Sequence, residues 1–151
     1  MTDKGSFIMN ANFKNRMKQA REQEINLSLT DVISHEDFIL ALCLFLDEFK
    51  RSNRKQHMIS QPPTPDRPSG GPKSTAKREN LCVLAATAHK LANDNDLEVP
   101  NWVFEPQYKM PTPVFAFNTT NKEYQAFLIA DTPPEFAEKN IYHGASAIER
   151  V

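Results

Sequence analysis

The sequence predicts a mainly α-helical protein with an irregular C-terminal half. Residues 35–51 and 76–93 each repeat apolar side chains at helical spacing over several turns. Four Gly in 151 residues are too few for the tight turns of an all-β fold. Nine of the eleven Pro lie in residues 61–72 and 97–117, where they exclude long helices. We expect two core helices, a Pro-rich mobile linker and at most one or two short strands.

The length suits one compact domain, and the hydrophobic content of 40% is enough for a modest core. We expect an N-terminal helical region over 1–52, a flexible linker over 53–75, and a C-terminal region over 76–151. In this arrangement the C-terminal region packs with the helix at 35–51 as one domain.

The charge is unevenly distributed along the chain. Residues 1–80 hold 13 Lys/Arg and 10 Asp/Glu, whereas residues 81–151 hold 5 and 9, and the formal net charge is −1. A generic nucleic-acid binder is usually strongly basic, so the overall balance argues against that class. The basic excess belongs to the N-terminal half.

The two cysteines, Cys43 and Cys82, each lie within an apolar helical pattern. Two cysteines do not form a disulfide framework, so we interpret them as reduced core thiols of a cytoplasmic protein. No apolar run approaches the roughly 20 residues of a membrane span. Lys4 is not followed by an apolar segment, so no signal peptide is predicted.

A thin apolar stripe predicts a weakly held helix over residues 12–24. Basic side chains cover the rest of its surface, which indicates either a solvated face or contact with an acidic partner or phosphates. If the protein binds DNA, the candidate nucleic-acid contacts are Lys14, Lys18 and Arg21.

After a short turn ending at Ile33, a broad apolar stripe predicts a core helix over residues 35–51, with Ser34 as N-cap. Leu40, Cys43 and Leu44 widen the stripe beyond one face. We therefore expect this helix to be contacted on more than one side. Its stripe consists of Phe38, Ile39, Leu42, Phe45, Leu46 and Phe49.

Residues 53–75 are rich in Pro and Gly and contain a run, 61–75, without any large apolar side chain. Such a composition buries too little surface to offset chain entropy, which predicts a mobile linker. The spacing of Pro62, Pro65 and Pro68 also fits a ligand of proline-reading domains, although linker composition explains it.

Ser74 or Thr75 is expected to cap the second core helix, over residues 76–93. Its stripe consists of Leu81, Leu84, Ala85, Ala88, Leu91 and Ala92. The polar run that ends it lacks the Gly and Glu positions of a calcium loop, so we predict no metal site there.

Residues 97–117 carry the only Trp, three Phe and four Pro, and we expect an irregular segment pinned across the helices. Trp102, Phe104 and Tyr108 are the candidate partner-binding residues. The alternative is that Trp102 anchors the core, and the exposure of these three side chains decides between the two.

The remaining elements are predicted to be short. Residues 114–117 favour a strand, and residues 124–130 favour a helix capped by Asn121 over a strand. Thr132 is expected to cap a brief helix reaching Asn140, after which 141–142 are extended and 145–151 form a last turn.

The sequence contains no Gly-rich phosphate loop, CxxC, HExxH or GxSxG motif. Cys82 and His89 lie two helical turns apart, about 10 Å, which is too far for a direct thiol–imidazole pair. We therefore predict no enzyme activity, no cofactor and no catalytic or metal-binding residues.

Several short elements occur in a fixed order: 45–49 (FLDEF), 97–103 (LEVPNWV), 113–115 (PVF), 131–136 (DTPPEF) and 139–143 (KNIYH). This succession resembles a poorly characterised group of small bacterial antitoxin-like proteins. The resemblance covers about two-thirds of the chain and omits the N-terminal helix and the linker. The resemblance implies that this protein neutralises a toxin enzyme. Some proteins of the group are associated with toxins of the nucleotidyltransferase type. The resemblance implies no catalytic residues.

Taken together, these observations favour a non-enzymatic bacterial protein–protein interaction module, in which a toxin encoded alongside is the implied partner. The alternative is a DNA-binding transcriptional regulator that uses the basic N-terminal helix, although no helix-turn-helix spacing is present.

Overall fold

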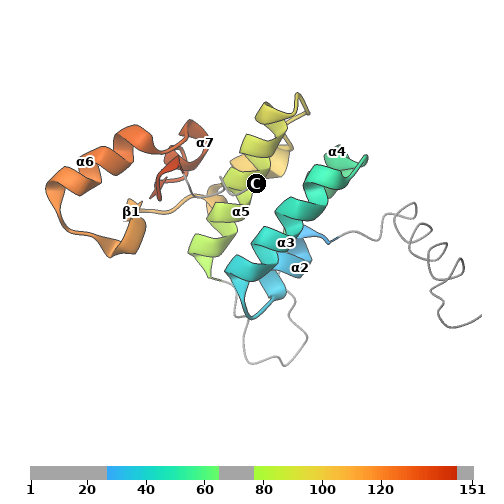
Figure 1. Ribbon diagram of the computed structural model, residues 1–151, viewed down its shortest axis with the longest axis horizontal. Coiled ribbons are helices and arrows are strands. Elements are labelled where there is room, and N and C mark those ends of the chain that lie inside the picture. The colour runs from blue at the N-terminus through green and yellow to red at the C-terminus, as the bar shows by residue number, and fades with distance from the viewer. Residues whose placement is uncertain (1–26, 65–76, 146–151) are drawn as a thin grey trace, which may run out of the picture.

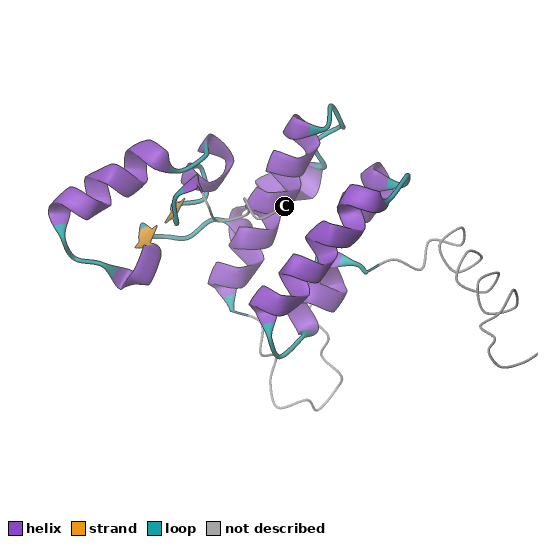
Figure 2. Cartoon of the chain, in the orientation of Figure 1, coloured by secondary structure: helices purple, strands orange, loops and turns teal. Residues whose placement is uncertain are grey.

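A computed structural model describes residues 27–64 and 77–145 of the chain (Figure 1). The described part is mainly α-helical with two short strands, which confirms the predicted fold class (Figure 2). The α-helices are α2 (Leu29–Ser34), α3 (Phe38–Arg51), α4 (Lys55–Ser60), α5 (Arg78–Asp94), α6 (Lys122–Asp131) and α7 (Pro134–Ala137). The 3-10 helices are η1 (Asn101–Phe104), η2 (Pro106–Tyr108) and η3 (Ala116–Asn118), and the strands are β1 (Val114–Phe115) and β2 (Ile141–Tyr142).

The two long helices, α3 and α5, form the centre of the fold, and α6 lies on the opposite side of α5 from α3 (Figure 1). One apolar cluster joins the N-terminal helices to the C-terminal half. Its fully buried members include Phe45, Phe49, Leu84, Phe136 and Ile141. Because these residues come from α3, α5, α7 and β2, distant parts of the chain share one core.

The turn before α3 differs from the sequence prediction. Ser34 was expected to be the N-cap of this helix, but it is the last residue of α2. Asp37 is the actual N-cap, and its carboxylate accepts a hydrogen bond from the backbone N–H of Leu40 at 3.1 Å. The reason is that Ser28 and Asp31 form a capping box, which begins a separate helix where only a turn was predicted.

The predicted mobile linker over residues 53–75 is wrong for its first part, because residues 55–60 form α4. Met58 and Ile59 of this helix are buried, and Ile59 is inaccessible to solvent. Two apolar side chains in a polar stretch are a weak sequence signal, and a six-residue helix is stable only when it packs on a core. Residues 65–75 lie outside the described ranges.

The second core helix, predicted over 76–93, runs from Arg78 to Asp94 as α5. Lys77 occupies its N-cap position without a side-chain hydrogen bond, and the predicted caps Ser74 and Thr75 lie outside the described ranges. Its apolar face is buried as the periodicity predicted, and Leu84, Ala85 and Ala88 have no exposed surface.

The two predicted short strands pair in parallel, with Val114 opposite Ile141 and Phe115 opposite Tyr142. The helix predicted after Asn121 is α6, and the Asn121 side chain caps it by accepting from the N–H of Tyr124 at 2.8 Å. The helix prediction is confirmed, whereas the strand predicted over 114–117 is right only for its first two residues, because Ala116 and Phe117 belong to η3.

Thr132 is not the cap of α7 that the sequence predicted. The N-cap position belongs to Pro133, and Pro134 begins the helix. The Thr132 hydroxyl instead accepts a hydrogen bond from the Gly144 N–H at 3.0 Å in a buried position. The Thr132 side chain therefore makes a tertiary hydrogen bond with Gly144 instead of capping α7.

Within the described ranges, none of the helices combines the length and the apolar composition needed to cross a bilayer.

Candidate interaction surfaces

Two of the three predicted partner-binding side chains, Trp102 and Tyr108, are buried. Their rings meet edge to face with centroids 5.1 Å apart, and the Trp102 indole N–H donates to the carbonyl of Ile59 at 3.0 Å. Buried Trp and Tyr usually satisfy their polar atoms in this way. The prediction that these two side chains face a partner is wrong, and the alternative, that Trp102 anchors the core, is what the structure has.

Phe104, the third predicted partner-binding residue, remains 52% exposed. Its ring packs edge to face on His89, with centroids 5.2 Å apart, and the Lys139 ammonium lies 5.6 Å from its centroid. Lys139 is itself buried and donates to the carbonyl of Val103. This cluster ties the aromatic segment to α5 and to the turn before β2.

The titratable groups near this cluster do not assemble a reactive site. Burial raises the pKa of the Cys82 thiol above its ordinary value of 9.0, with Arg78 opposing the shift, so the thiol stays protonated at neutral pH. Burial lowers the pKa of Lys139 from its ordinary value of 10.5. The two histidines of this half contact separate carboxylates: His89 lies 3.6 Å from Glu138, and His143 lies 3.3 Å from Glu79.

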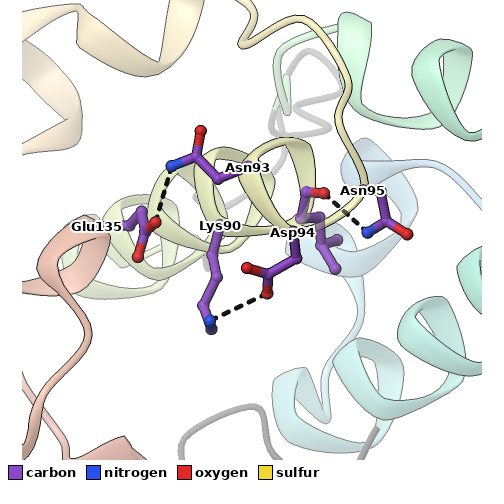
Figure 3. A network of polar contacts seen from close by, with 6 residues as sticks. Lys90, Asn93, Asp94, Asn95 and Glu135 are labelled. Carbon is purple, nitrogen blue, oxygen red and sulfur yellow. Dashed lines mark hydrogen bonds and ion pairs between the residues drawn. The ribbon is translucent and has the colours of Figure 1, made fainter.

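The polar network at the end of α5 is structural (Figure 3). Asn93 donates to Glu135 of α7 at 2.8 Å, and Lys90 pairs with Asp94 one turn along α5 at 3.0 Å. The side chain of Asn95 turns back to the Leu91 carbonyl at 2.8 Å. Across residues 27–64 and 77–145, no three His, Cys, Asp or Glu side chains are grouped to hold a metal ion.

A shallow pocket of about 380 Å³ lies between α4 and the segment before η1. Its lining includes Gln56 and Glu98, whose amide and backbone groups exchange two hydrogen bonds of 2.9 Å. These bonds pair the Gln56 side-chain amide with the Glu98 backbone, and we assign no ligand to this pocket.

Apart from Phe104, the exposed large apolar side chains of the described residues fall into two groups. The first lies on α3 and is called the α3 face: Ile39 (61% exposed), Leu40 (49%) and Leu44 (48%). The second surrounds α6 and is called the α6 arm: Phe117 (89%), Phe127 (58%), Ile129 (52%) and Tyr124 (37%).

The α3 face has a physical origin in the sequence pattern. The core side of α3 is filled by Leu42, Phe45, Leu46 and Phe49, so the extra apolar residues of its first two turns point away from the core. Leu40 and Leu44 are the residues that widened the apolar stripe in the sequence. Ile39 was predicted to belong to the core stripe, but it is exposed. Four carboxylates flank the α3 face along the chain: Glu36 and Asp37 before it, and Asp47 and Glu48 after it.

The α6 arm begins at a backbone turn that suits Asn118 but not Phe117. Phe117 and Asn118 have φ of 58° and 52°, a region that a bulky side chain such as Phe seldom adopts. The turn leaves the Phe117 ring almost fully in solvent. The residue types of Phe117 and Phe127 predict burial, because aromatic side chains are expected in the core, and both are exposed.

The candidate nucleic-acid contacts Lys14, Lys18 and Arg21 lie outside the described residues, so the structure places none of them. In comparisons with protein-family models, curated proteins and solved structures, nothing matches the chain.

Proposed function

We propose that this protein is a non-enzymatic interaction module that binds a protein partner through the α3 face. The observation that carries the proposal is the exposed apolar surface of Ile39, Leu40 and Leu44 on a helix whose other side is already committed to the core. A helix that is apolar on both sides is ordinarily buried on both sides. A partner that covers the outer side would remove this surface from water.

The charges around the α3 face favour a different protein over a second copy of this chain. In an antiparallel pairing that sets Leu40 against Leu44 of a second copy, Asp37 falls opposite Asp47. Like charges that face each other across an interface cost affinity. An apolar strip with Lys or Arg at its edges meets the same face with opposite charges, so this is the partner chemistry we propose.

The resemblance to small bacterial antitoxin-like proteins supports a finer version of the proposal, in which the partner is a toxin enzyme encoded alongside. The one matching element within α3 is residues 45–49, and it includes Asp47 and Glu48 beside the exposed patch. In this version the module neutralises the enzyme by occupying a basic region of its surface, in the bacterial cytoplasm.

The proposal is tested with two matched variants, Ile39→Glu on α3 and Ile129→Glu on α6. Both change an Ile of similar exposure into Glu, and both leave the core intact. A tagged full-length chain is expressed in its host, and any stoichiometric partner is identified, purified and titrated calorimetrically. We expect Ile39→Glu to weaken binding at least about 10-fold, as at interface hot spots, and Ile129→Glu to leave it unchanged.

Recovery of the full-length chain without a stoichiometric partner would contradict the proposal, as would a partner whose affinity Ile39→Glu does not change. A salt-sensitive shift of duplex DNA that is lost in a Lys14→Ala, Lys18→Ala double variant would support the regulator hypothesis instead.

A further inference from the structure

The α3 face fits an amphipathic helix with basic edges, and the sequence of this chain contains such a segment. The apolar pattern of residues 12–24 predicts a helix, and these residues lie outside the described ranges. Phe13, Met17 and Ala20 fall on one side of that predicted helix, at i, i+4 and i+7. The segment therefore offers an apolar strip about two turns long.

Basic side chains border this strip on both sides. At about 100° per residue, Arg16 lies about 60° to one side of Phe13 on the predicted helix. Arg21 and Lys14 lie about 80° and 100° to the other side. Residues 13–21 contain four basic and no acidic side chains. This is the partner chemistry proposed for the α3 face, an apolar strip with Lys or Arg at its edges.

The charges around the α3 face are opposite in sign to those of the segment. Two carboxylates precede the face and two follow it: Glu36, Asp37, Asp47 and Glu48. Complementary charges along a shared apolar strip favour one partner and fix its register. A second copy of α3 brings acid against acid, whereas residues 13–21 bring four cations to the same surface.

The point where the described chain begins puts the segment within reach of the α3 face. Leu27 packs against the core and lines a small cavity together with Met58 of α4, the helix that follows α3 after a short turn. Residues 22–26 can span at most about 17 Å. Asp47 lies about 6 Å along the axis from the end of α3. The connection is therefore long enough to place Arg21 level with Asp47.

This connection also sets the direction of the segment. With Arg21 beside the carboxylates that follow the face, a segment parallel to α3 reaches the first turn of α3 with Phe13, about 12 Å further on. Phe13 then lies level with Leu40, and Met17 lies level with Leu44. The apolar strip and the α3 face coincide in this register.

The charges beyond the α3 face agree with the parallel direction. Past Arg21 the segment becomes acidic, with Glu22 and Glu24, whereas α3 ends in the basic pair Lys50 and Arg51. In the parallel register Glu24 lies level with Arg51, so opposite charges meet. The antiparallel direction brings the same glutamates to the acidic start of α3, where like charges repel.

We propose that residues 13–21 cover the α3 face of their own chain, and that the protein partner binds by displacing them. The inference rests on the proposed function, since it names what regulates the same surface. A tethered segment acts at an effective concentration of about 1 mM, so a dissociation constant of about 0.1 mM keeps the face covered in roughly nine molecules of ten. The apparent affinity for the partner is then about 10-fold weaker than that of the uncovered face.

Cysteine cross-linking in the full-length chain tests the docking without any partner. In a Cys43→Ser background, with the fully buried Cys82 retained, mild oxidation should join Met17→Cys to Leu44→Cys within one chain. The matched control pairs Leu44→Cys with Asn15→Cys, because position 15 lies about 160° from Met17 on the predicted helix. We expect the Met17 pair to cross-link at least about 10-fold faster than the control pair.

Equal rates for the two pairs, or no cross-linking in either, would overturn the inference. A disulfide between two chains would also overturn it, because a second copy would then cover the α3 face. Nonreducing electrophoresis and mass spectrometry of proteolytic fragments separate these outcomes.

Titration of the purified partner tests the displacement. The double variant Phe13→Glu, Met17→Glu should bind the partner about 10-fold more tightly than the wild type, because it leaves the α3 face uncovered. The double variant Asn15→Glu, Gln19→Glu adds the same charge on the opposite side of the predicted helix. It should bind the partner like the wild type.

The variant Ile39→Glu separates the two proposals. If it weakens partner binding and Phe13→Glu, Met17→Glu leaves the affinity unchanged, the displacement is wrong and the proposed function stands. If Ile39→Glu has no effect on the partner, the proposed function fails and the displacement fails with it. The cross-linking still decides whether the segment covers the face.

Charge reversal provides a graded check of the register. Arg21→Glu should slow the cross-linking of the Met17 pair by a few-fold at low salt and by less at high salt. Adding Asp47→Arg should restore the rate, because the two charges are then exchanged. An effect of Arg21→Glu that Asp47→Arg does not reverse would contradict the parallel register.

Discussion

The helices α3 and α6 both expose apolar side chains, but they are held in place very differently. Helix α3 buries five residues, including Phe45 and Phe49 in a stacked pair. These core contacts hold the helix, and with it the α3 face, in a fixed position. Helix α6 buries only Leu128 and is anchored at its C-terminal end. The comparison teaches that exposed apolar area alone does not specify a partner. The charges around it matter as well, because the carboxylates of Glu36, Asp37, Asp47 and Glu48 flank the α3 face along the chain.

The largest expected effect comes from a phenylalanine of α3 that has no exposed surface. Phe45→Ala removes a core ring and leaves a cavity, so we expect it to lower the free energy of unfolding by about 3–5 kcal/mol. Urea unfolding followed by circular dichroism measures the change. The matched substitution on the other helix, Phe127→Ala, should change it by less than about 0.5 kcal/mol. Similar losses for both variants would mean that α6 is as firmly integrated as α3.

An intermediate effect is expected at the glycine that anchors α6. Gly144 has φ of +89°, and an added Cβ would lie 3.4 Å from the Asp131 carboxylate and 3.5 Å from Leu128, so conformation is a greater obstacle than space. We expect Gly144→Ala to cost about 1–2 kcal/mol, because an L side chain is strained at this φ. Amide hydrogen exchange should quicken in α6 and stay unchanged in α3.

Gly144→Asn is the control for this substitution, because Asn tolerates positive φ better than Ala does. Equal exchange rates in α6 for the wild type and Gly144→Ala would show that the anchor does not depend on this conformation.

The smallest expected effect is a pH dependence at Lys139, which lies between the α6 anchor and the aromatic segment. Because burial lowers its pKa below 10.5, the unfolded chain binds more protons than the folded chain in the window just below that value. The free energy of unfolding of the wild type should therefore rise, relative to Lys139→Met, as the pH increases toward 10.5.

Unfolding of both chains at neutral and alkaline pH measures this difference. Both chains carry Cys82→Ser, because the Lys139 ammonium lowers the pKa of the Cys82 thiol and Lys139→Met would change that pKa in one chain only. The comparison with Lys139→Met is still needed because burial raises the pKa of Tyr108, which lowers stability at alkaline pH in both chains. A difference that stays constant with pH would contradict a lowered pKa of Lys139.

Much of the fold follows from local sequence signals. The apolar periodicity predicted α3 and α5, and Asn121 marked the start of α6, because caps and stripes act within a few residues of the chain. The strands at Val114 and Ile141 were also predicted, but not their parallel pairing. Pairing joins residues far apart in the chain, and no local pattern encodes it.

The candidate surfaces were only partly predictable. The widened stripe of α3 predicted contact on a second side, but among the described residues nothing covers Leu40 and Leu44, which are exposed. The prediction that Trp102 and Tyr108 bind a partner was wrong, because these residue types are common both in binding hot spots and in protein cores. Composition cannot separate the two roles, since both depend on large aromatic area.

The sequence by itself determined where α3, α5 and α6 form and that the fold is mainly helical, because capping and periodicity are local, whereas α2 and α4 were not predicted as helices. Only the tertiary structure decided which apolar side chains the core accepts. The core has room for Trp102, Ile59 and Phe45, whereas Ile39, Phe117 and Phe127 remain in water. That choice depends on the limited volume between packed elements, and no single segment contains this information.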